Sequence, residues 1–405
     1  MKKFLLSIIL SIPLYTIAQQ QEVRCGNADV LKPYLENNAA AKRNADIIDS
    51  IKTAFLNDPQ KLSNAQNATY IIPVVFHVFA NNAQALVPVA QCQSALDKAN
   101  EDFNAWNADL STVDPEFIGR ASSIKINFVL AQLDTNGNAT LGVTYHPLDS
   151  GFGAYQVMDN IIAQYAWNNY KYMNIYVMND LFGNGVNNNS GIAYPPDTYN
   201  SNNKIDRIVY NYWYLGNTGS SIADPEFQST ITHEYGHWLS LGHTFGGNCN
   251  DADGIADTPP SDAAGGGCGP NAVHCGGNIN GENYMDYNAS CYKMYTQGQV
   301  TKMLAALQHP TRFPLWQQSN LIAAGLGQYV GINDVNKQEI KCVVSDNILY
   351  TDAEKFFIYD LLGNIVAQQS NSYSYSLSSI ASGAYIVSLE KEGQQKFRKI
   401  TVLKQ

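Results

Sequence analysis

The spacing of apolar and polar residues divides the chain into segments of different character. The first apolar run covers residues 4–17, follows Lys2 and Lys3, and ends at the small-residue pattern of residues 16–18. A basic start, a short apolar stretch and small residues at its end are typical of a secretory signal peptide. We therefore expect residues 1–18 to be removed on export, and export places the cysteines where disulfides form.

Residues 19–66 are polar and helical in pattern, and we expect them to form a pro-segment. A β-branched apolar run at residues 70–76 then predicts a buried strand, and apolar positions at helical spacing over residues 91–106 predict a helix. Further strands are expected over residues 124–128, 172–178 and 208–214. Strands that alternate with helices predict an α/β (α+β) domain with a twisted mixed sheet, over residues 67–317.

The pattern changes again after residue 317. Residues 318–332 are punctuated by Gly and Asn, and we expect them to be a linker. Residues 333–405 contain short strands separated by turn signals, which predict a small all-β sandwich.

Composition and charge narrow the class of protein. Hydrophobic residues make up 45% of the chain and charged residues 15%, a balance that excludes a disordered chain. The 35 acidic residues outnumber the 25 basic ones, which argues against nucleic acid as a partner because phosphate binding needs a basic surface. Beyond the first twenty residues no apolar run reaches the roughly 18 residues of a membrane span, so we expect no transmembrane segment in the mature protein.

Two histidines four residues apart stand on a predicted helix. The segment from His233 through Glu234 to His237 has the His-Glu-x-x-His spacing, which places both imidazoles on one helix face. The carboxylate of Glu234 is then placed to hold a water on a cation bound by the imidazoles. The alternative is a helix whose histidines are ordinary surface residues.

A third histidine, His243, follows six residues after His237 and reaches the same cation only if the chain turns sharply after Leu239. Three imidazoles and one water make a tetrahedral catalytic zinc site with an open position. Zinc lowers the pKa of such a water to about 7, so that Glu234 is able to act as general base. The sequence therefore predicts Zn²⁺ held by His233, His237 and His243.

These residues resemble the metzincin clan of zinc peptidases, and within it the pappalysin family. The resemblance runs from about residue 72 to residue 303, and matching text includes residues 243–247, 257–259, 283–287 and 296–299. It implies a metzincin-like domain in which Met285, in the Met-turn, forms an apolar floor beneath the zinc ligands and Tyr287 stabilises the oxyanion. It further implies a secreted zinc endopeptidase that acts on protein or peptide substrates and is made as a latent zymogen.

Two positions depart from the family pattern. Ser240 stands where the family has the glycine that ends the helix, and a positive φ is costly for a residue with a Cβ. Ser290 stands where relatives that prefer a basic residue after the cleaved bond carry an acid. The first departure puts the site geometry in question, and the second puts that cleavage preference in question.

Four cysteines, Cys249, Cys268, Cys275 and Cys291, lie close together in the sequence and allow three pairings. The resemblance implies the disulfides Cys249–Cys275 and Cys268–Cys291. A four-cysteine zinc site is the alternative, but the Cys-x-x-Cys spacing that favours it is absent from the sequence.

The same region offers hard oxygen donors. Asp251, Asp253 and Asp257 are spaced as a calcium loop uses them, and Thr258 follows directly. Such Asp-Gly clusters are also common in plain turns. The pappalysin resemblance implies calcium beside this stretch, so we expect a structural Ca²⁺ here, with these four residues as candidate ligands.

Cys25 stands in an Arg-Cys-Gly sequence at the front of the pro-segment. A thiolate is a good zinc ligand, and the sequence resembles the cysteine switch that holds metzincin zymogens latent. We expect Cys25 to bind the zinc until residues 19–66 are removed; the alternative is a thiol with another role, alone or in an intermolecular disulfide. Cys92 is expected to be a small buried apolar residue, and Cys342 is assigned no partner.

The remaining histidines, His77, His146, His274 and His309, lack ligand spacing, and we expect them to be structural or surface residues. Residues 191–195 have the pattern of an extended edge, and the resemblance to the metzincin clan implies that substrate backbone pairs with such an edge by β-augmentation. An ordinary Gly-Pro loop explains the same residues equally well.

The last 70 residues resemble the C-terminal sorting domain of the type IX secretion system, on residues 360–364, 377–380, 382–387 and the basic residues near position 398. The Pro-Asn-Pro box of that domain is missing, and Asp346-Asn347 stands near its place. The resemblance implies outer-membrane secretion machinery as a partner and a secreted or cell-surface protein of a Gram-negative bacterium. A carbohydrate-binding or generic β-sandwich is the alternative.

Two other functions remain open for the same scaffold. One is a zinc hydrolase that acts on a non-protein amide, and the other is a surface binding or adhesion protein that has lost turnover. Replacing Glu234 by Ala separates an enzyme, which should lose nearly all hydrolysis, from a binding protein, which should be unaffected.

Overall fold

The computed structural model divides the chain into two compact units, Met1–Asn333 and Asp334–Gln405. The signal peptide predicted at residues 1–18 lies outside the described residues. The structure describes residues 25–26, 34–79, 87–147, 151, 153, 158–183, 185, 189–246, 248–250, 253–264, 267–269, 273–329, 342–345, 347–351, 353–360, 364–370, 374–391 and 394–402.

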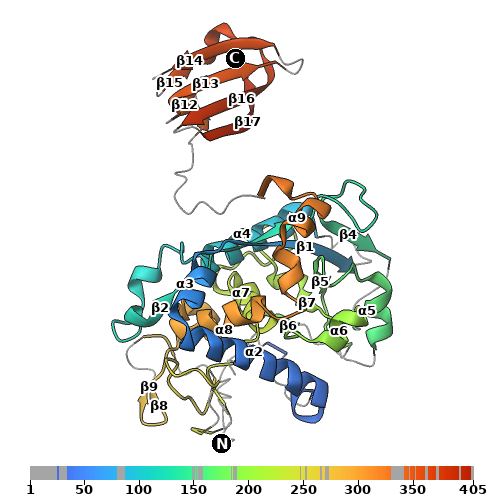
Figure 1. Ribbon diagram of the computed structural model, residues 1–405, viewed down its shortest axis with the longest axis vertical. Coiled ribbons are helices and arrows are strands. Elements are labelled where there is room, and N and C mark those ends of the chain that lie inside the picture. The colour runs from blue at the N-terminus through green and yellow to red at the C-terminus, as the bar shows by residue number, and fades with distance from the viewer. Residues whose placement is uncertain are drawn as a thin grey trace, which may run out of the picture. The chain divides into compact units, whose positions relative to one another are not determined.

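A mixed six-stranded sheet forms the centre of the first unit (Figure 1). Its order is β3 (Ile126–Leu130), β1 (Tyr70–Phe79), β5 (Met173–Met178), β7 (Ile208–Asn211) and β6 (Gly191–Ala193), and β4 (Val143–His146) also pairs with β1. The pairs among β1, β3, β4, β5 and β7 are parallel, whereas β6 is antiparallel to β7. This arrangement confirms the predicted α/β class and places one antiparallel strand at the edge of the sheet.

Helices and short ribbons surround the sheet. The described helices of this unit are α2 (Ala39–Asn57), α3 (Pro59–Asn67), α4 (Val89–Phe103), α5 (Asp159–Tyr165), α6 (Thr198–Asn202), α7 (Thr230–Trp238), α8 (Gln297–Leu307) and α9 (Gln318–Ala323). Two short ribbons pair β2 (Ala121–Ser122) with β10 (Tyr295–Thr296), and β8 (Val273–His274) with β9 (Gly277–Asn278).

The strands bury both faces, because successive side chains of a strand point in opposite directions. In β1, Ile72 and Val74 belong to the large core that includes residues of α4 and α7. Ile71 and Val75, on the opposite face, pack with Leu321 of α9. The nearly continuous run of apolar residues in β1 is therefore explained by a strand that is covered on both faces, as is usual in parallel sheets.

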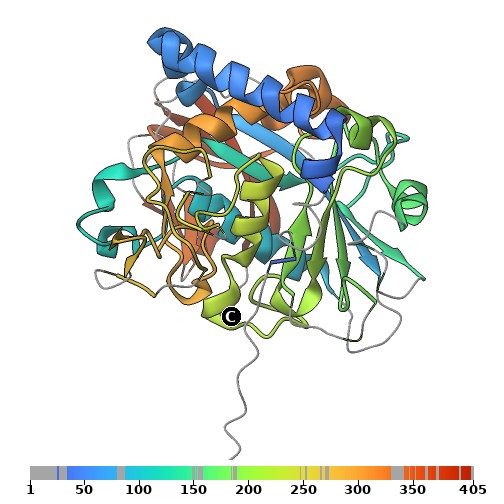
Figure 2. The same ribbon diagram turned by 90° about the horizontal axis from the view of Figure 1, so that it is seen from below.

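The predicted pro-segment region contains α2 and α3, which lie against the domain. Figure 2 shows α2 running beside α8, and the two helices are in contact. Ile48 and Phe55 of α2 are buried in the same core as the sheet. This helix therefore contributes apolar packing as well as a polar outer face.

Several boundaries differ from the sequence-based expectations. The strand expected over residues 208–214 ends at Asn211, because Tyr212–Tyr214 form a short 3₁₀ helix, and the strand expected over residues 124–128 lies at Ile126–Leu130. The expected linker at residues 318–332 is wrong in its first part, because residues 318–323 form α9 and Leu321 is buried against the sheet. The helix expected over residues 91–106 ends at Phe103, and Ala105 has a φ of 55°. A residue in the left-handed conformation cannot continue an α-helix. Trp106, which was expected to be in this helix, lies beyond its end and is 67% exposed.

The second unit is a β-sandwich. One sheet has the order β11 (Cys342–Ser345), β12 (Ile348–Thr351), β15 (Ser374–Ser376), and the other β14 (Ile365–Ser370), β13 (Lys355–Tyr359), β16 (Gly383–Lys391), β17 (Gln394–Val402). All of these pairs are antiparallel. Leu349, Phe356, Ile358, Val387 and Leu389 fill its core, which confirms the predicted all-β unit.

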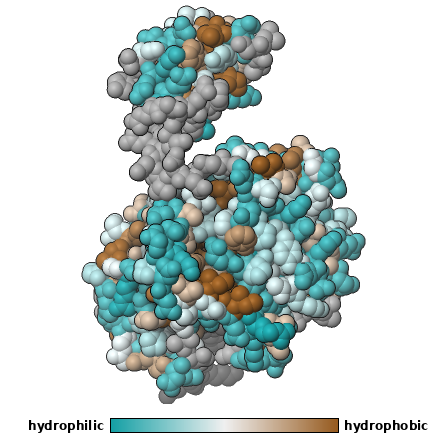
Figure 3. All heavy atoms as spheres, in the orientation of Figure 1, coloured by the Kyte–Doolittle hydropathy of each residue, from teal (hydrophilic) through white to brown (hydrophobic). Residues whose placement is uncertain are grey.

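Among the described residues, none of the helices has the length and apolar character that crossing a membrane requires. Figure 3 shows one face of the molecule as largely polar, with small apolar patches between the polar side chains.

Candidate active site

The helix α7 carries the His-Glu-x-x-His segment through the middle of the first unit. All nine of its residues, Thr230–Trp238, are buried. Gly236 is required by packing, because a Cβ at this position would lie 2.4 Å from Sδ of Met285. Met285 of the Met-turn therefore lies directly against α7 at Gly236, a position between His233 and His237 in the sequence.

The chain turns sharply after α7 through a left-handed residue. Ser240 has a φ of 72°, and the amide of Leu241 donates to the carbonyl of Gly236 at 2.9 Å. The serine thus adopts the conformation that glycine favours at a helix end, at a cost of about 1–2 kcal/mol for a residue with a Cβ. The turn brings His243 back to α7, so the departure at position 240 leaves the geometry of the site intact.

The three histidines face one another through their Nε2 atoms. Nε2 of His237 lies 3.0 Å from Nε2 of His233 and 3.0 Å from Nε2 of His243. Nδ1 of His233 donates to the carbonyl of Tyr284 at 2.6 Å, and Nδ1 of His237 donates to the carbonyl of Leu241 at 2.8 Å. Because the Nδ1 atoms of His233 and His237 hold the protons, the Nε2 lone pairs of these two histidines point at each other, and a shared cation removes this repulsion.

Burial keeps these imidazoles neutral. It lowers the pKa of His233 to about 4. Burial, together with the neighbouring imidazoles, holds the pKa values of His237 and His243 well below the usual range. Neutral imidazoles with their protons on Nδ1 are the form that binds zinc, so the donor set fits the predicted ion.

Glu234 is fully buried next to this cluster. Its two carboxylate oxygens receive no hydrogen bond from an N–H or O–H group of the described residues. Burial raises the pKa of Glu234 to about 8, and the nearby thiol of Cys25 opposes this rise. A buried carboxylate without such donors is costly unless a ligand or water completes it. Once the thiol of Cys25 leaves, the carboxylate is therefore able to accept a hydrogen bond from a water beside the histidines.

The Met-turn is held by a pair of amide side chains. Asn283 donates to Gln299 at 2.8 Å, and Gln299 donates back at 2.9 Å. The amide of Met285 donates to Oδ1 of Asn283 at 2.9 Å. These bonds connect the Met-turn to the start of α8.

Residues Cys25 and Gly26 of the predicted pro-segment lie in the candidate site. The ligand atoms of Cys25, His233, His237 and His243 all lie within 4.8 Å of one another. The hydroxyl of Tyr287 donates to the carbonyl of Cys25 at 3.0 Å. The amide of Gly26 donates to the carbonyl of Gly191 in β6 at 2.8 Å, so the edge strand accepts a backbone bond from a second segment.

The cysteine-rich region is closed by two disulfides, Cys249–Cys275 and Cys268–Cys291. This is the pairing that the family resemblance implies. Cys92 is fully buried in α4, and burial raises its pKa to about 12.

The predicted calcium ligands are only partly described. Asp251 lies outside the described residues. Asp253 accepts from the hydroxyl of Thr258 at 2.7 Å and from the amide of Ile255 at 2.9 Å. Asp257 accepts from Thr296 at 2.7 Å and from the amide of Gly298 at 2.8 Å, so its carboxylate joins this loop to the start of α8.

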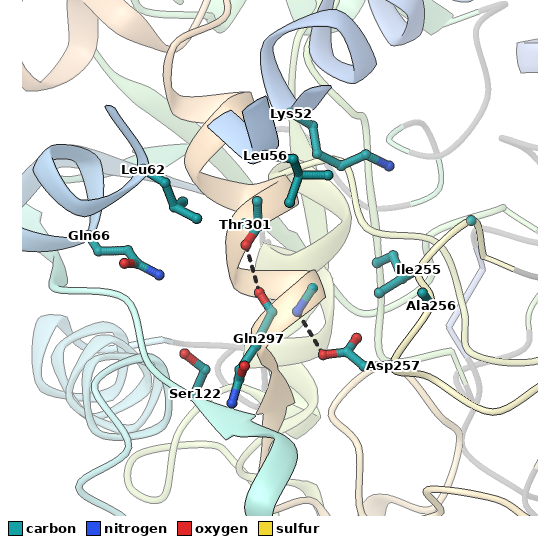
Figure 4. Close-up of a pocket in the computed structure, with 12 residues that line it drawn as sticks. Lys52, Leu56, Leu62, Gln66, Ser122, Ile255, Ala256, Asp257, Gln297 and Thr301 are labelled. Carbon is teal, nitrogen blue, oxygen red and sulfur yellow. Dashed lines mark hydrogen bonds between the residues drawn. The ribbon is translucent and has the colours of Figure 1, made fainter. Parts of the chain in front are cut away.

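A surface pocket of about 560 Å³ lies beside the same loop. Figure 4 shows Lys52 and Leu56 of α2 on one side and Ile255 and Asp257 on the other. None of the three histidines lines this pocket, so it is separate from the candidate active site.

The other histidines make ordinary structural contacts. His77 is fully buried, and its Nε2 lies 2.9 Å from Oδ1 of Asn174. His309 is buried beside Asn44 of α2, and His274 contacts Asp262 at the surface.

The sequence analysis did not identify two residues that lie beside His233 and α7 in the folded chain. The hydroxyl of Tyr292 donates to the carbonyl of Asp286 and lies 3.5 Å from Nδ1 of His233. Arg312 is fully buried, and its side chain donates a hydrogen bond to the carbonyl of Trp238, the last residue of α7. Spacing gives no signal for either residue, because their partners become neighbours only in the folded chain.

Two family profiles match parts of the chain. The family profile described as pregnancy-associated plasma protein-A matches residues 156–308. The profile of the secretion system C-terminal sorting domain matches residues 336–403.

Two solved structures are similar over most of the first unit. Mature mirolysin of Tannerella forsythia, in complex with a cleaved peptide, is 32% identical, and the match covers 63% of this chain and 98% of that chain with a TM-score of 0.55. A promirolysin variant of the same organism is 30% identical over 71% of this chain and 95% of that chain, with a TM-score of 0.57.

Curated relatives match over shorter stretches. An extracellular metalloprotease of Sordaria macrospora is 35% identical over 147 residues, which are 33% of this chain and 47% of that protein. One from Podospora anserina is 32% identical over 184 residues, 44% of this chain and 58% of that protein. The chain spans about half the length of these curated relatives. With the match to nearly all of mirolysin, the chain belongs to the pappalysin family of metallopeptidases.

Proposed function

We propose that the protein is a secreted zinc endopeptidase that is synthesised as a latent zymogen. The observation that carries this proposal is the meeting of three neutral imidazoles at 3.0 Å beside the buried carboxylate of Glu234, which receives no hydrogen bond from an N–H or O–H group of the described residues. The names of its relatives, mirolysin and extracellular metalloproteases, support the same activity.

His233, His237 and His243 would hold the ion. Bound zinc would polarise the scissile carbonyl and acidify a water. Glu234 takes a proton from the attacking water and passes it to the leaving amine, because its carboxylate lies beside the histidines with its oxygens available. Tyr287 donates a hydrogen bond to the oxygen that gains negative charge. The donation that its hydroxyl makes to the carbonyl of Cys25 supports this role.

Latency follows from the position of Cys25. Its thiol is among the histidines, and the next residue pairs with β6, where we propose that substrate backbone binds. The pro-segment then blocks both the cation and the edge strand until it is removed. The promirolysin structure among the neighbours supports a precursor form.

The loop that contains Asp253 and Thr258 remains the proposed site of a structural calcium ion, with Asp251 and Asp257 as further candidates. Burial raises the pKa of Asp253, and a bound cation would offset the cost of this buried charge. Calcium should raise the melting temperature of the wild type but not that of Asp253→Asn; an equal shift in both would contradict the assignment.

The second unit is proposed to direct export through the type IX secretion machinery to the medium or cell surface. Its match to the sorting-domain profile over residues 336–403 supports this role. A chain truncated at Gly331 should not cross the outer membrane and should be absent from the medium. Its appearance in the medium would contradict the proposal.

The enzymatic proposal is tested with a peptide library and the processed protein. Cleavage detected by mass spectrometry should stop when a zinc chelator is added and resume when zinc is restored. Glu234→Ala should leave the library intact. A processed, zinc-loaded protein that cleaves none of the peptides would refute the proposal, and so would a Glu234→Ala variant that still cleaves them.

A further inference from the structure

We infer that Arg312 is a positioning residue that sets the spacing between the edge strand β6 and the helix α7. The inference rests on the proposed peptidase function, because it concerns two walls of the proposed site: the strand with which a substrate would pair and the helix that carries Glu234. β6 is the proposed backbone-binding edge, and α7 carries Glu234, so their spacing determines where a bound peptide bond meets the general base.

The contacts of Arg312 connect both walls. Its Nε donates to the carbonyl of Trp238, the last residue of α7, at 3.4 Å. Its Nη2 donates to the carbonyl of Tyr194, the residue directly after β6, also at 3.4 Å. One rigid guanidinium group therefore bridges the end of the helix and the end of the strand.

Asp206 holds this guanidinium in place. The two carboxylate oxygens accept from Nη1 and Nη2 of Arg312, which makes a bidentate pair with almost no exposure of either side chain. The guanidinium also lies 4.0 Å from the centre of the Trp238 ring. A planar, buried and doubly bonded guanidinium has little freedom, so it acts as a spacer of defined width.

The opposite end of β6 meets α7 without a spacer. A Cβ on Gly191 would lie 2.7 Å from Cγ of Glu234, so strand and helix are in tight contact at the catalytic residue. Thus the strand is fixed to the helix at two points, by direct contact at Gly191 and through Arg312 at Tyr194. A change at Arg312 would tilt the strand about its contact with Glu234.

The chain offers a matched control in Arg207. This arginine is also fully buried, its side chain pairs with Asp159 at 2.9 Å, and it donates to the hydroxyl of Tyr194 at 3.1 Å. Its hydrogen bonds among the described residues go to the carbonyls of Gly153 and Ile205 and to the Tyr194 hydroxyl, and not to the carbonyl of Trp238. Replacing Arg207, whose partner Asp159 is 28% exposed, therefore disturbs the ion pair of another buried arginine without removing the bridge to α7.

The experiment compares processed, zinc-loaded wild type, Arg312→Lys and Arg207→Lys on one extended fluorogenic peptide. Lysine keeps the charge opposite Asp206 but loses the fork that reaches both carbonyls. We expect Arg312→Lys to lose about 10- to 100-fold in kcat/KM, mainly in kcat, because misplacement of about 1 Å has effects of this size. Arg207→Lys should retain kcat, even where its melting temperature falls as much.

All rates are measured well below each melting temperature, with zinc content determined in the same samples. An Arg312→Lys enzyme with wild-type kcat and full zinc content would overturn the inference. Equal kcat losses in both lysine variants would also overturn it, because they would indicate a general effect of buried ion pairs.

If Arg312→Lys does not fold, Asp206→Asn is measured instead, since it keeps the arginine but weakens its support. This variant should lose kcat with normal zinc content, and an unchanged kcat would overturn the inference. A wild type that cleaves nothing refutes the proposed function itself, which the wild-type assay shows before any variant is compared.

Discussion

The hydroxyl of Tyr287 donates a hydrogen bond to the backbone carbonyl of Cys25, 3.0 Å away. The residue proposed to assist hydrolysis thus also contacts the segment proposed to prevent it. A substrate carbonyl and the Cys25 carbonyl would compete for the same phenol, so the proposed precursor would block the site partly by imitating a bound peptide.

Replacing Cys25 by Ala should give a precursor that cleaves peptides without processing, because the thiol among the histidines is lost. The measurement is the rate of peptide cleavage by the unprocessed chain, with gel analysis to show that residues 19–66 remain attached. Cys92→Ala is the control, since Cys92 is buried in α4 and its loss should leave the precursor latent. An equally latent Cys25→Ala precursor would refute the switch.

Gly191→Ala should impair catalysis, because the added Cβ would lie 2.7 Å from Cγ of Glu234. Relief of this clash moves either the edge strand or Glu234, the proposed general base, and overpacking of this kind costs about 1–3 kcal/mol. If this energy is lost from the stabilisation of the transition state, kcat/KM falls by about 5- to 150-fold. Gly119→Ala is the control, because a Cβ there meets no atom within 4 Å. Equal activities of the two variants would contradict the assignment of the contact.

Ser240→Gly should stabilise the protein while keeping its activity. Ser240 has a φ of 72°, and glycine removes the strain of this conformation, although its greater freedom in the unfolded chain offsets part of the gain. The expected rise in unfolding free energy is up to about 1 kcal/mol. Thermal unfolding of the precursor measures it, with Ser240→Ala as a control that should be nearly neutral. A lower melting temperature for Ser240→Gly would contradict this reading of the turn.

Acid should destabilise the protein in part through His77, because burial lowers its pKa in the folded state to about 3. The unfolded chain protonates this imidazole near pH 6.5, whereas the folded chain does not. Its contribution to stability is therefore full above about pH 6.5 and is lost as the pH falls towards 3, by up to about 1.4 kcal/mol per unit.

Unfolding in denaturant at pH values from 7 to 4 measures this slope. His77→Gln should flatten it relative to the wild type in the same metal state, whatever the variant's stability at pH 7. An unchanged slope would contradict the assignment.

The sequence predicted the histidine cluster because its chemistry lies in one short stretch. His233 and His237 share a helix face by spacing alone, and His243 needs only one turn. The position of Ser240 raised a question that spacing does not answer, because whether a serine tolerates a positive φ depends on the packing around it.

Contacts between residues that are far apart in the sequence could not be predicted from local sequence patterns. Arg312 contacts residues 74, 106 and 118 positions away, and no local pattern encodes such contacts. The sequence predicts a linker where the structure has the short helix α9, because six residues near glycines and asparagines show too little apolar periodicity to predict a helix. Its burial is decided by the sheet against which it packs.

Zinc binding and hydrolysis measured on the same samples test the central claim most directly. Metal-free, processed wild type and Glu234→Gln are titrated with zinc, and peptide cleavage is followed at each addition. Both proteins should bind one zinc ion per chain, and only the wild type should cleave, with activity that rises in proportion to bound zinc. A wild type that binds no zinc at the histidines, or a Glu234→Gln variant that cleaves as fast as the wild type, would contradict the account.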